Sequence, residues 1–328
     1  MIRRREFLGA GVGTALAAAI AAQGASGDKM RFAYSGSALT GQDDNGEQKF
    51  NETDEQIKAN FKLCARYGFQ GVEPFRGQMG HLNKDLMAFK AILDESGLKL
   101  CTVTGGGDII SPDKVAATIE DNFNFTRDFL KPLGCQHLKI NIAGPGGRTP
   151  GGTPAEQLKA AARGCNELGK RVNEELGMKF GFHPHIWSPI ENEHEMNAIL
   201  EMTDPRYVGL VPDTAHLVLA GMDPVKVLRD NYSRIVAIHV KDTDAKYRNW
   251  RGPTPTREQH KERNLYQVMG SGGVDFAAFF RVLREHNYSY WVDLDYDAAR
   301  KDEGTLEQQL AANAGFLREK LKFPLSKS

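Results

Sequence analysis

Histidine and aspartate residues follow directly on several short apolar runs of this 328-residue chain. The clearest run, Tyr207–Pro212, stops at Asp213. Two further runs end at His183, with His185 two residues later, and at His239. Imidazole and carboxylate groups are ligands that suit Mn²⁺, Co²⁺, Zn²⁺, Fe²⁺ or Mg²⁺. The residue types therefore indicate a site for one divalent metal ion, with Asp213 as a ligand.

The alternation of side chains along a strand decides which of these groups share a face. Residues two apart point the same way, which applies to His183 with His185, His239 with Lys241, and Asp293 with Asp295. A single strand-end histidine or aspartate is more often a cap or a surface residue than a ligand. Four consecutive strands that end this way favour a shared site instead. The polar strand-end residues are Glu73, Lys139, Asn141, His183, His185, Asp213, His216, His239, Lys241, Asp293 and Asp295.

Short apolar runs alternate with amphipathic helical patterns between Met30 and Leu321. In the first helical pattern, Thr53 is the expected cap, and Ile57, Phe61 and Cys64 share one face. The expected strands are 30–34, 71–75, 98–103, 137–142, 178–183, 207–212, 234–240 and 290–294. Eight such strand–helix units without a leftover domain predict an α/β protein with a single (β/α)₈ TIM barrel. In that fold all strands end at one face, so the polar strand ends converge.

Three connections between these elements stand out. The glycines Gly105–Gly107 are predicted to form a turn after the third strand, and Gly144–Gly147 a loop after the fourth. Neither has the Lys or Ser/Thr partner that would indicate a phosphate site. Residues 243–273 are too many for a plain connection and are predicted to cover the barrel mouth as a lid or binding loop, with a disordered excursion as the alternative.

The N-terminus has the pattern of an export signal. Arg3–Arg5 precede Phe7-Leu8 and an uncharged run from Gly9 to about Ala22, followed by small residues. This pattern predicts a twin-arginine (Tat) signal peptide of about residues 1–27, and a periplasmic or secreted domain of residues 28–328. A membrane anchor fits less well because the apolar run is short, so no stable membrane association is expected after processing.

Composition excludes some classes of protein. The chain has 42 basic and 42 acidic residues, and this balance argues against a nucleic-acid partner. A hydrophobic content of 41% is ample for a core, and a homo-oligomer is compatible with it. The cysteines are widely spaced and favour buried apolar positions, although a disulfide stays an alternative. They are Cys64, Cys101, Cys135 and Cys165.

The motifs at the strand ends, around Glu73, His183, Asp213 and His239, resemble those of the xylose isomerase-like TIM barrels, which include sugar phosphate isomerases and epimerases. The resemblance spans about Met30 to Leu321 and implies one divalent metal ion and a small-molecule carbohydrate substrate. It rests on Gly71-Val72-Glu73, Phe182-His183-Pro184-His185, Pro212-Asp213-Thr214-Ala215-His216, Ile238-His239-Val240-Lys241-Asp242 and Gly270-Ser271-Gly272-Gly273-Val274-Asp275-Phe276.

The resemblance also implies a ligand set. The family holds its metal with Glu, Asp, His and Glu from strands five to eight. Asp213 and His239 match directly, Asp295 stands at the last Glu, and His183 stands at the first. His185 is then the substitute ligand or the base. Because the strand-five carboxylate is missing, the resemblance disfavours symmetric two-base epimerisation.

The resemblance implies a divalent-metal-dependent enzyme of the isomerase or epimerase type, which abstracts a proton next to the carbonyl of a sugar or keto-sugar through a metal-bound enediolate. His185 and Glu73 are the candidate bases, and His216 and Lys241 would bind substrate oxygens. Lys241 could equally pair with Asp242, and Trp187 and Trp250 could stack on a sugar ring. The alternatives are a dehydratase or 3-keto-glycoside lyase, a non-catalytic sugar-binding barrel, and an endonuclease IV-like phosphodiesterase, which the neutral charge disfavours.

Overall fold

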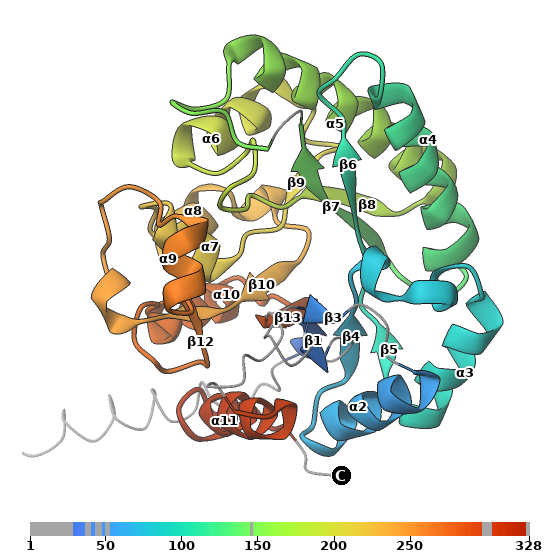
Figure 1. The fold of residues 1–328 in the computed structure, drawn as a ribbon, viewed down its shortest axis with the longest axis vertical. Helices are drawn as coiled ribbons and strands as arrows, with labels where there is room; N and C mark the ends of the chain where they lie inside the picture. The colour runs from blue at the N-terminus through green and yellow to red at the C-terminus, as the bar shows by residue number, and fades with distance from the viewer. Residues whose placement is uncertain are drawn as a thin grey trace, which may run out of the picture.

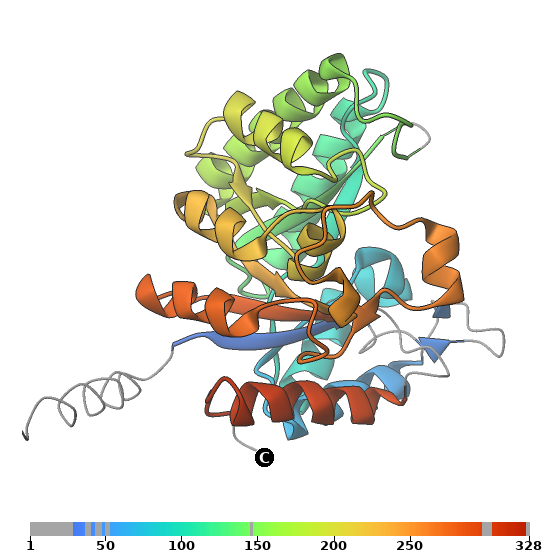
Figure 2. The ribbon, with the colours of Figure 1, turned by 90° about the vertical axis from the view of Figure 1, so that its left-hand side faces the viewer.

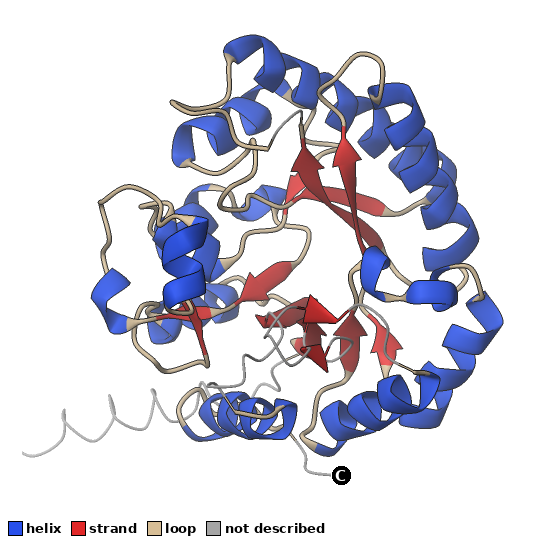
Figure 3. Cartoon of the chain, viewed as in Figure 1, coloured by secondary structure: helices blue, strands red, loops and turns tan. Residues whose placement is uncertain are grey.

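The computed structural model describes residues 29–325 except 37–40, 43–47, 50–52, 145–146 and 297–303. The strands form a central ring with helices around it (Figures 1 and 3). The predicted signal peptide and part of the loop Gly144–Gly147 lie outside the described residues. Within the described part, no helix has the length and apolar character needed to cross a membrane.

The central ring is a closed parallel barrel. Its strands are β1 (Arg31–Gly36), β4 (Gly71–Glu73), β5 (Lys99–Leu100), β6 (Thr104–Asp108), β7 (His137–Ala143), β8 (Lys179–Phe182), β9 (Gly209–Leu210), β10 (Ile238–Val240) and β13 (Trp291–Tyr296). They form two sheets, in the orders β10-β13-β1-β4-β5 and β6-β7-β8-β9. Parallel bridges join the sheets at both edges, from Phe75 to Thr104 and from Asp213 to His239. The predicted (β/α)₈ barrel is confirmed, with β5 and β6 sharing the third position.

Helices cover the outside of the barrel. They are α2 (Asp54–Arg66), α3 (Leu86–Ser96), α4 (Val115–Phe125), α5 (Ala155–Leu176), α6 (Glu193–Met202), α7 (Thr214–Leu219), α8 (Pro224–Asp230), α10 (Phe276–Glu285) and α11 (Leu306–Glu319). Side-chain caps fix where several begin, and Thr53 and Asn192 form capping boxes on α2 and α6. The predicted inner face of α2, with Ile57, Phe61 and Cys64, is buried.

The prediction of a turn at Gly105–Gly107 is wrong. These glycines lie in β6, which pairs in parallel with β7. A side chain at Gly105 would collide with the Asn122 amide of α4, whose oxygen would lie 2.3 Å from the added Cβ. Asn122 in turn accepts a hydrogen bond from the Gly106 N–H and donates one to its carbonyl. The glycines therefore allow a helix to approach the strand closely, rather than turning the chain.

Residues 243–273 form an ordered cover rather than a disordered excursion. The segment carries α9 (Arg257–Glu262), and β12 (Tyr266–Gln267) pairs antiparallel with β11 (Asp242–Thr243). Figure 2 shows this orange segment beyond the carboxyl ends of the strands. Its far end is held by Asp242, whose carboxylate accepts N–H groups of Gly270, Gly272 and Val274. The β11–β12 pairing and the Asp242 carboxylate therefore hold the two ends of the cover together.

The barrel interior also contains a neutral histidine away from the strand ends. His137, at the start of β7, is fully buried, and its Nδ1 lies 3.1 Å from the Tyr290 hydroxyl. Its Nε2 has no hydrogen-bond partner among the described residues. Burial lowers the pKa of His137 from 6.5 to about 4. The His137 imidazole therefore binds a proton more weakly in the folded protein than in the unfolded chain, where it is protonated below pH 6.5.

This difference predicts an acid sensitivity that depends on His137. Its folded-state pKa is lowered, so stability is present above pH 6.5 and is lost as the pH falls toward 4. Between pH 7.5 and pH 5, we expect the unfolding free energy of the wild type to fall by about 2 kcal/mol more than that of the His137→Phe variant. Urea unfolding of both proteins at the two pH values measures it. A variant with the same pH dependence as the wild type would contradict the assignment.

Candidate metal centre

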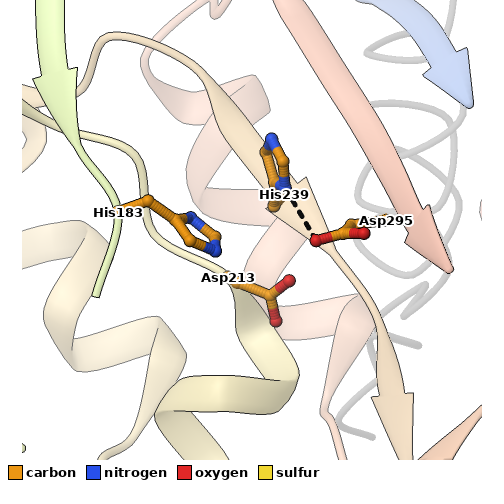
Figure 4. A group of neighbouring side chains, drawn as sticks. All are labelled: His183, Asp213, His239 and Asp295. Carbon is orange, nitrogen blue, oxygen red and sulfur yellow. Dashed lines mark hydrogen bonds and ion pairs between the residues drawn. The ribbon is translucent and has the colours of Figure 1, made fainter. Parts of the chain in front are cut away.

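Four buried side chains converge at the carboxyl ends of β8, β9, β10 and β13. They are His183, Asp213, His239 and Asp295 (Figure 4), and one ligand atom from each lies within 4.8 Å of the others. All four are at most 3% exposed. The structure thus brings together the four residues predicted as metal ligands, because neighbouring parallel strands deliver their ends to one point.

His183 presents one defined nitrogen to this cluster. Its Nδ1 lies 2.9 Å from the carbonyl oxygen of Val211, which can only accept a hydrogen bond. Nδ1 therefore carries the proton, and Nε2 keeps its lone pair. A backbone carbonyl that fixes the ring and tautomer is the usual support of a metal-binding histidine.

Asp213 has one carboxylate oxygen committed and one free. Its Oδ1 caps α7 by accepting the N–H groups of Ala215 and His216, at 2.8 and 3.1 Å. Its Oδ2 is buried and has no hydrogen-bond partner among the described residues. Burial raises the pKa of Asp213 above its ordinary value. A buried carboxylate oxygen without a partner lowers the stability of the fold unless a cation binds to it.

His239 and Asp295 complete the cluster as a pair. The His239 Nδ1 lies 3.2 Å from Asp295 Oδ2, and the Lys241 ammonium lies 3.5 Å from the same oxygen. Burial opposes the charge on Asp295, but Lys241 and the His239 hydrogen bond hold its pKa well below the ordinary range. Ser35 donates a hydrogen bond to the other oxygen, Oδ1. Asp295 is therefore held as an anion.

The residues present fit a divalent cation. The cluster offers two imidazoles and two carboxylates, one carboxylate oxygen is orphaned, and carbonyl or hydroxyl groups orient the donors. Mixed nitrogen and oxygen donors suit the borderline ions Mn²⁺, Fe²⁺, Co²⁺ and Zn²⁺. The set does not select among them.

Glu73, a predicted second base, lies behind His239. Its carboxylate is 2.7 Å from the Lys139 ammonium and 3.1 Å from His239 Nε2, the nitrogen opposite the one that faces Asp295. Thr104 also donates a hydrogen bond to it. Burial opposes its charge, yet His239 and Lys139 lower the pKa of Glu73 strongly. These contacts favour a role in orienting His239 rather than proton abstraction.

His185 and His216 form a ring pair beside the cluster. Their centroids are 3.7 Å apart, and each lies within 6 Å of the His183 ring. His185 Nδ1 donates to the Ile186 carbonyl at 2.6 Å, which leaves Nε2 unprotonated in the neutral ring. His185 is half-buried, whereas His216 is 1% exposed. His185 is therefore the more accessible of the two imidazoles.

Tyr266 is a site residue that the strand-end reasoning missed. It comes from β12 in the cover, is 2% exposed, and places its hydroxyl 3.5 Å from His216 Nδ1. The Lys241 ammonium lies over its ring, 4.2 Å from the centroid. A tyrosine in a long polar segment carries no periodic signal. Only its pairing opposite Thr243 directs it into the site.

The remaining predicted residues lie at the margin. Asp293 is buried, neither of its oxygens has a hydrogen-bond partner among the described residues, and its Oδ2 lies 3.8 Å from His239 Nε2. Burial raises its pKa strongly. Trp187 packs against the cover: its indole N–H donates to the Pro255 carbonyl and its ring contacts Arg257. Trp250 packs on Tyr247. Both tryptophans have structural contacts, and neither joins the four-residue cluster.

Comparison with known families agrees with the barrel fold. A family model described as xylose isomerase-like TIM barrel matches residues 61–320. The chain belongs to this family. The predicted resemblance to this family is thereby confirmed over residues 61–320.

Individual relatives of the family differ in their reactions. The chain is 29% identical to an inosose dehydratase of Clostridium tetani over 286 residues, 83% of this chain and 92% of that protein. Among solved structures, a D-allulose 3-epimerase from Methylomonas has a TM-score of 0.65 at 16% identity, covering 89% of this chain and 96% of that one. A probable 3-DHS dehydratase from Bacillus anthracis has a TM-score of 0.63 at 14% identity, covering 89% and 100%. At these identities, the likeness to the two structures is one of fold alone.

Proposed function

We propose that the protein is a divalent-metal-dependent enzyme that removes a proton next to the carbonyl of a keto-sugar or keto-cyclitol. The four-residue cluster, beside the His185–His216 pair, carries this proposal. An ion held by His183, Asp213, His239 and Asp295 would polarise the substrate carbonyl and offset the charge that develops on its oxygen. Two imidazoles outside the cluster are then available for proton transfer and substrate binding.

In this proposal His185 is the base. Its Nε2 has a lone pair because Nδ1 donates to the Ile186 carbonyl, and its half-buried position lets a substrate reach it. The C–H electron pair passes into the new double bond toward the carbonyl, while the proton stays on Nε2. His216 and the Lys241 ammonium hydrogen-bond the substrate oxygens, and Lys241 offsets negative charge there.

Elimination is the outcome that the residue pattern favours. Symmetric epimerisation needs a base on each face of the carbon, whereas strand five offers His183, whose Nε2 faces the cluster. The imidazoles of His183, His185 and His216 lie together. Glu73 is buried and contacts His239 on the side away from Asp295. The similarity to inosose dehydratases supports a dehydratase or lyase, and isomerisation is the second candidate.

Incubation in D₂O tests this function directly. Protein loaded with Mn²⁺ or Co²⁺ is incubated with inososes, ketohexoses and keto-glycosides. The masses of the recovered compounds are then measured by mass spectrometry. We expect deuterium uptake or loss of a substituent with at least one compound, and neither with His185→Gln. Loss of water or an alcohol indicates elimination, and uptake without loss indicates isomerisation. Metal-independent sugar binding without exchange would instead support a binding protein.

Tyr266 provides a graded prediction for the same reaction. Tyr266→Phe removes the hydroxyl near His216 but keeps the ring beneath Lys241, whereas Tyr266→Leu removes both. We expect kcat to fall roughly tenfold in the first variant, from one lost hydrogen bond. In the second it should fall roughly 100-fold, because a desolvated cation–π contact is also lost. Steady-state kinetics with equal metal loading measures this order, and equal kcat values in all three proteins would contradict it.

A further inference from the structure

An open cavity lies beside the metal centre and has no part in the function proposed so far. Its volume is about 490 Å³, and it is lined by residues that follow β4, by the first residues of β6 and by Asn141 of β7. Its lining includes Phe75, Arg76, Asn83, Thr104, Gly105 and Asn141. We call it the β4–β7 cavity.

Two connections place this cavity next to the cluster. Thr104, in its wall, donates a hydrogen bond to Glu73, which contacts Nε2 of His239. Asn141 follows Lys139 by two residues on β7, so both side chains point the same way, and the Lys139 ammonium lies 3.2 Å from His239 Nε2. The cavity and the cluster are therefore adjacent, with the buried Glu73 and Lys139 side chains between them.

The lining is suited to a neutral, hydroxyl-bearing group. Asn141 Oδ1 is buried and has no hydrogen-bond partner among the described residues, so it lacks a donor. Arg76 is the only charged residue in the described lining, and its guanidinium pairs with both oxygens of Asp121 and stacks on Phe125. Its charge is therefore already offset. The Phe75 ring adds an apolar surface, and Gly105 and Gly106 leave room.

The size of the cavity adds a second constraint. Sites of roughly 300–1,000 Å³ hold ligands of drug size. A single six-membered ring bound at the cluster would leave a further cavity of about 490 Å³ beside it. A second ring would use this space, the Asn141 acceptor and the Phe75 surface together.

We propose that the β4–β7 cavity binds a neutral polyhydroxylated ring that is attached to the reacting keto-sugar, with Asn141 as its hydrogen-bond acceptor. The substrate class is then a two-ring glycoside rather than a single keto-sugar or a sugar phosphate. This inference rests on the proposed function for the part of the substrate at the cluster, but the cavity can be tested without turnover.

Calorimetric titration with unreactive probes tests the cavity. Trehalose, glucose and glucose 6-phosphate are titrated into the metal-loaded wild type, Asn141→Ala and Asn173→Ala, which removes an exposed amide on α5. We expect trehalose to bind more tightly than glucose, and Asn141→Ala to weaken trehalose about tenfold, as for one lost hydrogen bond. Glucose binding should be unchanged, and Asn173→Ala should match the wild type.

A second variant and a structure guard against misfolding. Phe75→Leu should also weaken trehalose but not glucose, and a crystal soaked with trehalose should show a ring hydroxyl within hydrogen-bond distance of Asn141 Oδ1. Equal affinity for glucose and trehalose, unaffected by Asn141→Ala, would overturn the proposal, as would tighter binding of glucose 6-phosphate than of trehalose. If trehalose binds as expected but no keto compound exchanges deuterium, the proposed reaction fails while the cavity assignment stands.

Discussion

Asp213→Asn should abolish binding of a divalent ion without unfolding the protein. Asparagine keeps an oxygen that can cap α7, so the hydrogen bonds to Ala215 and His216 are retained. The substitution removes the negative charge at Oδ2, the oxygen without a hydrogen-bond partner among the described residues. Because burial raises the pKa of Asp213, a neutral side chain there does not lower stability in the absence of metal. Activity should fall about 10³-fold, since a bound ion supplies several kcal/mol of charge stabilisation.

Two measurements on chelator-treated protein check this result. Calorimetry with Mn²⁺, Co²⁺ and Zn²⁺ should give one site in the wild type and none in the variant. The wild type should also gain about 2.7 kcal/mol of stability at an ion concentration of 100 times Kd, and the variant should gain nothing.

Asp223→Asn is the matched control for this prediction. Asp223 also caps a helix, α8, but it is exposed and is not one of the four cluster residues. The Asp223→Asn variant should bind the ion with the affinity of the wild type. Stoichiometric, wild-type affinity in Asp213→Asn would contradict the site.

The strand-end cluster could be predicted because barrel geometry leaves little freedom. Once eight parallel strands close, a side chain such as His183 or Asp213 at a strand end must meet its counterparts on neighbouring strands. The alternation of side chains also placed Lys241 with His239, and both are buried at the site. Local sequence and topology therefore determine which of these residues approach one another.

Other features depended on tertiary contacts that the local pattern does not encode. Gly105 reads as a turn residue, but the approach of Asn122 from α4 makes glycine necessary in a strand. Tyr266 enters the site through a two-residue antiparallel pairing within the cover. Glu73 has a strand-end position like the ligands, yet Lys139 and His239 engage its carboxylate inside the barrel. In each case a partner distant in the sequence decides the role.

The Glu73–Lys139 pair predicts the largest effect on stability. Both side chains are at most 1% exposed, and their charged atoms are 2.7 Å apart. Replacing Glu73 with Met leaves the Lys139 ammonium buried beside His239 without its counter-charge. We expect Glu73→Met and Lys139→Met each to cost about 3–5 kcal/mol of unfolding free energy. The double variant should lose much less than the sum, because no unpaired charge remains.

Urea unfolding, followed by circular dichroism and fluorescence, measures this cycle. The exposed pair Lys90–Asp94 on α3 is the control, and Asp94→Ala should cost under about 1 kcal/mol. Additive losses in the double variant would show that the two groups act independently. Glu73 also touches His239 Nε2, so even a stable Glu73→Met protein should hold its ion more weakly, by about 10–100-fold, the usual cost of losing a group that orients a ligand. Intact ion affinity in that variant would remove the orienting role and return Glu73 to the candidate bases.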